Sequence, residues 1–101
     1  MKLMAYFLTT SSFPPHKATE MGKAFQNLPK LPDFVKRLFI FIVPSSDIKG
    51  YALYEVPDDK AHEGYVAITK RSTGYFGIEG YKFTVEPLLT AKEALALIGL
   101  G

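Results

Sequence analysis

Apolar residues fill two unbroken runs of six, Leu3–Leu8 and Leu38–Val43. Side chains of a strand alternate between its two faces, so an unbroken run indicates a strand whose two faces are both buried. Two further segments are rich in aromatic and β-branched residues or alternate apolar with polar positions, which also favours strands. We therefore predict strands over residues 2–10, 35–43, 51–56 and 81–86.

Helical periodicity appears between these strands. Apolar residues recur at steps of three and four over residues 16–28, which predicts an amphipathic helix ended by Pro29 and Pro32. A second helix follows Pro57, with Asp58 or Asp59 as N-cap and Gly74 as the residue just beyond its end. Thr90 and Glu93 form a capping-box pattern that opens a short terminal helix ended by Gly99.

The resulting order is strand, helix, strand, strand, helix, strand. We interpret this order as an α+β, ferredoxin-like βαββαβ fold with one antiparallel sheet, both helices on one face, and a short C-terminal helix. With 101 residues, the chain (1–101) is expected to form a single domain.

Two helices on one face leave the other face of the sheet uncovered. Each central strand hides every second residue beneath the helices, so residues 4, 6 and 8 or residues 3, 5 and 7 stay on the open face. Such an apolar patch exceeds what a soluble monomer usually exposes. We therefore expect the partner to be a second copy of the chain, forming a homodimer about a two-fold axis.

Composition excludes several classes of protein. The chain has no cysteine, which removes disulfides and thiolate chemistry, and a formal charge of +2 from 12 basic and 10 acidic residues. The basic doublets Lys36–Arg37 and Lys70–Arg71 are separate, so we expect no nucleic-acid partner. The apolar runs are too short to span a membrane, and we expect a cytoplasmic protein without membrane contact, metal or cofactor.

Two segments resemble the dimeric α+β barrel group, in which two ferredoxin-like subunits face each other across their sheets. They are Gly50–Glu55 followed by Asp58 and Asp59, and Phe83–Leu89 before the capped helix. The resemblance covers nearly the whole chain and is closest to small uncharacterised families of that group. It implies a closed barrel, while relatives in the group range from cofactor-free monooxygenases and lactone isomerases to haem-degrading, dechlorinating and ligand-sensing proteins.

Three residues could act as an acid or a base. Glu55 ends an apolar strand, Glu86 belongs to the polar side of the last strand, and His62 lies one position from the apolar face of the second helix. Each of these three side chains could also be an ordinary exposed surface residue. His16 and His62, the two histidines, fall on different predicted helices, which gives no metal-ligand spacing.

Candidate ligand contacts combine tyrosine hydroxyls with charged groups. Arg37 shares a strand phase with Phe39 and Phe41, and could bind a carboxylate or pair with Glu55. Lys82, Thr84 and Glu86 form either a charged edge strand or the polar wall of a cavity. The candidate ligand-binding residues are Tyr6, Arg37, Tyr51, Glu55, His62 and Lys82.

The leading functional hypothesis is a dimeric barrel that binds a small hydrophobic or aromatic molecule in an apolar pocket of the barrel, between the two sheets, with carboxylate-bearing molecules among the candidates. A second hypothesis is a cofactor-free enzyme of the monooxygenase or lactone-isomerase type. A third is a structural homodimerisation module that binds no ligand. The sequence alone does not show whether the protein is an enzyme or a binding protein.

Overall fold

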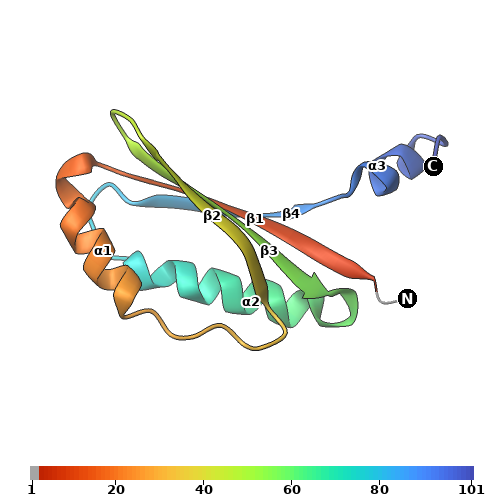
Figure 1. Cartoon of the computed structure of the whole chain (residues 1–101), viewed down its shortest axis with the longest axis horizontal. Coiled ribbons are helices and arrows are strands. Elements are labelled where there is room, and N and C mark those ends of the chain that lie inside the picture. The colour runs from red at the N-terminus through yellow and green to blue at the C-terminus, as the bar shows by residue number, and fades with distance from the viewer. Residues whose placement is uncertain (1–2) are drawn as a thin grey trace.

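An antiparallel sheet of four strands carries two helices on one of its faces (Figure 1), in a computed structural model that describes residues 3–101. The strands are β1 (Met4–Phe13), β2 (Lys36–Pro44), β3 (Ile48–Pro57) and β4 (Lys82–Leu88), in the spatial order β2-β3-β1-β4. The predicted α+β class is confirmed. The predicted first strand begins at Lys2, which lies outside the described residues.

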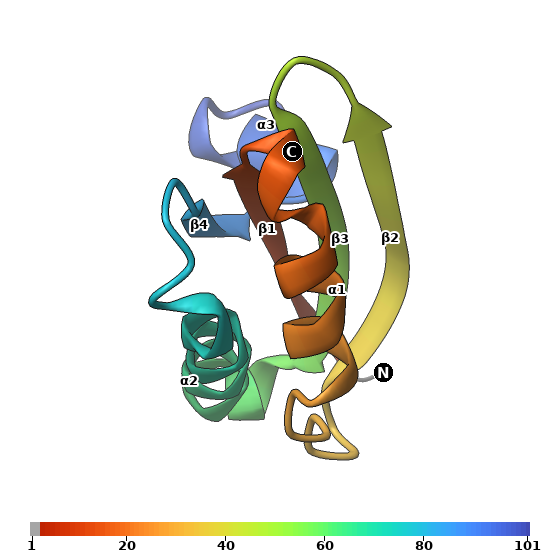
Figure 2. The same cartoon turned by 90° about the vertical axis from the view of Figure 1, so that its left-hand side faces the viewer.

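The helices are α1 (Ala18–Gln26), α2 (Ala61–Ser72) and α3 (Ala91–Leu97). Short 3-10 turns adjoin the first two: η1 (Pro15–Lys17) and η2 (Asp58–Lys60) precede them, and η3 (Thr73–Tyr75) follows α2. Helices α1 and α2 cover the same face of the sheet, whereas α3 extends beyond the end of the sheet (Figures 1 and 2).

Two of the predicted helix boundaries are wrong. Asp58 and Asp59 form the η2 turn, so Lys60 occupies the N-cap position of α2 and its side chain makes no capping hydrogen bond. Gly74 lies inside η3, and the glycines with positive φ are Gly77, Gly80 and Gly99. The 3-10 turns η2 and η3 adjoin the two ends of α2, so the capping positions differ from the predicted ones. The capping box of Thr90 and Glu93 is confirmed.

Strand register decides which residues face the helices. Directly paired residues of an antiparallel sheet share a face, and β1 pairs Phe7 with Tyr54 and Thr9 with Ala52. Phe7, Ala52 and Tyr54 are buried, so this set faces the helices. Residues 4, 6 and 8 therefore belong to the open face. The face bearing α1 and α2 is called the helix face below.

A β-bulge interrupts β2 between Arg37 and Phe39. Arg37 pairs with Tyr54 and Phe39 pairs with Leu53, so Leu38 is the additional residue. Because the extra residue reverses the alternation, Arg37 lies on the helix face while Phe39 and Phe41 lie on the open face. The predicted shared phase of Arg37 with Phe39 and Phe41, and hence its pairing with Glu55, is wrong.

The hydrophobic core lies between α2 and the sheet. Ile68 of α2 is 1% exposed and Val56 of β3 is fully buried, and both belong to a cluster of buried side chains. The other members of this cluster are Phe7, Val35, Ala52 and Tyr54. Helix α1 makes its main backbone contacts with η1 and η3 and not with the strands. The core therefore fills the α2 half of the helix face and leaves space beneath α1.

Candidate functional site

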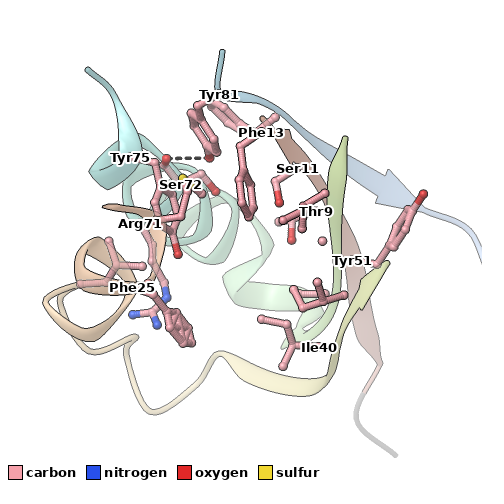
Figure 3. A pocket seen from close by; sticks show the side chains of 18 of the residues that line it. Thr9, Ser11, Phe13, Phe25, Ile40, Tyr51, Arg71, Ser72, Tyr75 and Tyr81 are labelled. Carbon is pink, nitrogen blue, oxygen red and sulfur yellow. Dashed lines mark hydrogen bonds between the residues drawn. The ribbon is translucent and has the colours of Figure 1, made fainter. Parts of the chain in front are cut away.

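A cavity of about 510 Å³ occupies the space between α1 and the sheet (Figure 3). The strands form its floor, α1 forms one wall, and the end of α2 with η3 forms another. Most of its lining is apolar or aromatic. The principal lining residues are Thr9, Ser11, Phe13, Met21, Gly22, Phe25, Leu28, Ile40, Ile42, Gly50, Tyr75, Tyr81 and Phe83, together with Arg37 and Arg71.

Small side chains on the sheet create this space. Thr9 and Ser11 of β1 point into the cavity (Figure 3), and Gly50 of β3 pairs with Ser11 in the register. A Cβ atom at Gly50 would lie 2.8 Å from the Ser11 hydroxyl oxygen, so no larger residue fits there without a shift. These short residues leave α1 without a flat apolar surface to pack on, and Met21 is its buried residue.

Aromatic rings close one end of the cavity. The ring centroids of Tyr75 and Tyr81 are 5.1 Å apart, and Tyr81 stacks on Phe83 at 5.7 Å. The Tyr81 hydroxyl donates a hydrogen bond of 2.9 Å to the Ser72 carbonyl oxygen at the end of α2. Burial raises the pKa of the Tyr81 phenol. This end of the cavity is therefore held by ring packing and by one partly buried hydrogen bond.

Two arginines lie at the side of the cavity that contains Phe25. The guanidinium carbon of Arg37 is 5.9 Å from the centre of the Phe25 ring, and that of Arg71 is 5.8 Å from it. Arg37 comes from β2, Arg71 from α2 and Phe25 from α1. Arg71 also donates a hydrogen bond to the Pro29 carbonyl oxygen. The bulge in β2 thus brings Arg37 to the same place as Arg71.

On the open face, Tyr6 and Glu55 form a pair across β1 and β3. They are directly opposite in the register, and the Tyr6 hydroxyl donates a hydrogen bond of 3.0 Å to a Glu55 carboxylate oxygen. This hydrogen bond is the main reason that the pKa of Tyr6 is raised. The bond keeps the proton on the phenol and one carboxylate oxygen occupied.

Apart from Arg37 and Tyr51, the candidate residues from the sequence lie outside the cavity. Tyr51 belongs to the lining, although its side chain points away from the space (Figure 3). The register places Lys82 and Glu86 on the open face, opposite Ser12 and Leu8. His62 is exposed on α2 and lines a separate pocket of about 580 Å³ between α2 and residues 29–34. Glu55, Glu86 and His62 therefore do not converge on one site. Arg37 and Tyr51 are the predicted ligand contacts that line the cavity.

Sequence reasoning missed most of the cavity. Thr9, Ser11, Tyr75 and Arg71 were not predicted as site residues, although each lines the space. One signal was present in the sequence: the doublets at residues 36–37 and 70–71 each contribute one arginine to the same side of the cavity. The doublets are separate in the chain and meet only through packing.

Among residues 3–101, no three of the histidine, aspartate and glutamate side chains lie close enough together to hold a metal ion. In the same residues, no helix has both the length and the apolar character that crossing a bilayer requires. Comparison of the chain with models of protein families, with curated proteins and with solved structures finds no match.

Proposed function

We propose that this protein binds a small hydrophobic or aromatic molecule in the cavity beneath α1, on the helix face, and not in the space between two sheets where the sequence-based hypothesis placed it. The observation that supports the proposal is the cavity itself, about 510 Å³ with a mainly apolar lining. Small-molecule sites are usually concave, largely apolar and about 300 to 1,000 Å³ in volume. The cavity falls within that range and has polar groups at a few positions only.

The space beneath α1 is a pocket partly open to solvent, and it is larger than the gaps that close packing leaves. Protein interiors are close-packed, and their voids are rarely larger than a water molecule. Here the α2 half of the same helix face is well packed, with Val56 and Ile68 almost completely buried. The contrast between the two halves supports a space that is kept open for a ligand.

We further propose that the chain forms a homodimer of ferredoxin-like subunits with the open faces of the two sheets together, as a dimeric α+β barrel. The strand order β2-β3-β1-β4 with two helices on one face supports the ferredoxin-like assignment. The open face carries large apolar side chains, and Phe41 is 64% exposed in the single chain. The same surface of a second copy would cover them.

The position of the ligand site can be tested with two leucine substitutions on one strand. Thr9 faces the cavity, and its neighbour Thr10 faces the other side of the sheet. Thr9→Leu should fill part of the cavity and weaken binding of the uncharged fluorescent probe N-phenyl-1-naphthylamine by about tenfold, which corresponds to about 1.4 kcal/mol. Thr10→Leu is the matched control and should leave the probe affinity unchanged.

The opposite result would contradict the proposed site. If Thr10→Leu weakens the probe and Thr9→Leu does not, the ligand occupies the space between the two sheets. If the wild-type protein does not bind the probe at all, ligand binding itself is refuted. Circular dichroism of both variants should show that each retains the fold.

A further inference from the structure

Arg37 and Arg71 carry all the formal charge in the lining of the cavity. The lining contains no aspartate, glutamate, lysine or histidine. The structure shows one ion pair within residues 3–101, Lys17 with Glu20 on α1 and the turn before it, so neither arginine is paired with a carboxylate there. Two positive charges therefore lie at one apolar surface without a compensating negative charge.

The two guanidinium groups lie at the same aromatic ring. Both lie within about 6 Å of the centre of the same Phe25 ring, at 5.9 Å and 5.8 Å. Cations stack on an aromatic ring because its faces are negative, but the ring offers only a partial charge to two full charges. Two like charges at one ring repel each other, and an anion that contacts both guanidinium groups would convert the repulsion into attraction.

A third group completes the arrangement. Tyr75 of η3 lies on the same side of the cavity as Arg71 and Phe25 (Figure 3). Burial raises the pKa of Tyr75, and the nearby positive charges of Arg71 and Arg37 partly oppose that shift. Both arginines are thus close enough to this phenol to affect its ionisation. A neutral phenol is a hydrogen-bond donor, so it adds to the guanidinium donors.

We propose that the ligand is a carboxylic acid with an apolar body, bound with its carboxylate at Arg37 and Arg71. The planar guanidinium fork matches the two oxygens of a carboxylate. The apolar body would extend over Phe25 into the cavity toward Thr9 and Ser11. This inference rests on the proposed ligand site and adds the chemical class of the ligand.

The test compares an acid with an alcohol of the same chain length. Decanoate and decan-1-ol displace N-phenyl-1-naphthylamine from the wild-type protein and from the double variant Arg37→Gln/Arg71→Gln. The double variant should lose about tenfold in decanoate affinity and keep its affinity for decan-1-ol within about twofold. The control is Lys36→Gln/Lys70→Gln, which removes the neighbouring charge of each doublet, outside the cavity, and should change neither affinity.

The possible outcomes separate this inference from the proposed function. If the probe binds to every variant and decanoate affinity is equal in both double variants, the carboxylate assignment is refuted while the cavity remains a ligand site. If the probe does not bind to the wild-type protein, both proposals are refuted. Arg71 also donates a hydrogen bond to the Pro29 carbonyl oxygen. If the double variant does not fold, the single variant Arg37→Gln replaces it in the same comparison of decanoate with decan-1-ol.

A second measurement needs no variant. Salt screens the attraction between the arginines and a carboxylate but has no such effect on an alcohol. Raising the ionic strength from about 0.02 M to about 0.5 M should weaken decanoate binding to the wild-type protein and leave decan-1-ol binding in place. Equal salt dependence for the two ligands would contradict the inference.

Discussion

Gly64 of α2 lies directly against Val56 of β3. A Cβ atom added at Gly64 would be 2.6 Å from Cγ1 of Val56, a distance that real side chains do not reach. Both residues are buried, and Val56 is fully inaccessible to solvent. The absence of a side chain at position 64 thus allows α2 to approach the sheet and form the core, while α1 stays farther away.

Gly64→Ala should therefore destabilise the protein, although alanine is the better helix former. The added methyl group must displace α2 or the Val56 side chain, and overpacking of this kind costs about 1 to 3 kcal/mol. The change in the free energy of unfolding can be measured by urea denaturation. Gly22→Ala in α1 is the control: an added Cβ there meets no atom within 4 Å. That variant should gain about 0.5 to 1 kcal/mol from helix propensity.

Local pattern was sufficient to predict the helices and the strands of this fold, although β1 continues to Phe13, beyond its predicted end at residue 10. The apolar runs correspond to β1 and β2, and the capping box of Thr90 and Glu93 opens α3 as expected. Helix boundaries were less accurate at 57–61 and 72–75, where 3-10 turns extend the helices. A 3-10 turn has no strong sequence signature, because it uses the same residues that open or close an α-helix.

The sequence could not predict which face of the sheet each β2 residue occupies, because residues 38–43 are all apolar. The alternation of apolar and polar residues shows which face of a strand is buried only when the two faces differ in polarity. Leu38, the additional residue of the bulge, is apolar like its neighbours and does not change this pattern. The β-bulge is visible only in the pairing of β2 with β3. The position of Arg37, and with it the arginine pair, therefore depends on tertiary structure. The cavity likewise follows from small residues on separate strands, such as Ser11 and Gly50.

Neighbouring residues of β2 give a test of the homodimer. Phe41 is 64% exposed on the open face, whereas Ile42 is 57% exposed and lines the cavity on the helix face. Phe41→Lys should place a charge between the two sheets and shift a micromolar sample from dimer to folded monomer in sedimentation velocity, since a buried unpaired charge is costly.

Ile42→Lys has the same chemistry on the opposite face. It should leave the dimer intact and weaken binding of N-phenyl-1-naphthylamine. A wild-type protein that sediments as a folded monomer at micromolar concentration would contradict the dimeric barrel. Loss of the dimer in Ile42→Lys but not in Phe41→Lys would assign the interface to the helix face instead.

Alkaline pH should destabilise the protein through Tyr81. Burial raises the pKa of this phenol, so the folded state holds the proton more tightly than the unfolded state. The unfolded state therefore loses its proton first as the pH rises above about 10, and the free energy of unfolding falls with pH from there. Urea denaturation at several pH values between about 8 and 11 measures the slope.

Tyr81→Phe should reduce the slope of the free energy of unfolding against pH. The variant also loses the hydrogen bond to the Ser72 carbonyl oxygen, which costs about 1 kcal/mol at neutral pH. Burial raises the pKa of Tyr75 as well, so part of the alkaline dependence should remain. An unchanged slope in Tyr81→Phe would show that the Tyr81 phenol ionises equally in both states.

Acid should unwind α3 without unfolding the rest of the domain. The Thr90 N–H donates to a Glu93 carboxylate oxygen at 2.9 Å, and the Glu93 N–H donates to the Thr90 hydroxyl oxygen at 3.1 Å. These contacts lower the pKa of Glu93, the backbone hydrogen bond of Thr90 most of all. The helix is therefore fully capped at pH values above the ordinary pKa of glutamate. It loses this capping as the pH falls through the lowered pKa of Glu93.

Nuclear magnetic resonance can follow this change at single residues. The carboxyl shift of Glu93 should titrate below the ordinary glutamate range, and the amide shifts of Leu95 and Leu97 should move toward coil values over the same interval. Thr90→Ala removes the hydroxyl acceptor but keeps the backbone N–H, so it should bring the Glu93 titration only part of the way back to the ordinary range. It should leave the thermal midpoint of the domain unchanged, because α3 lies beyond the end of the sheet (Figure 1). A lower thermal midpoint in Thr90→Ala would show instead that α3 packs against a second copy and contributes to its stability.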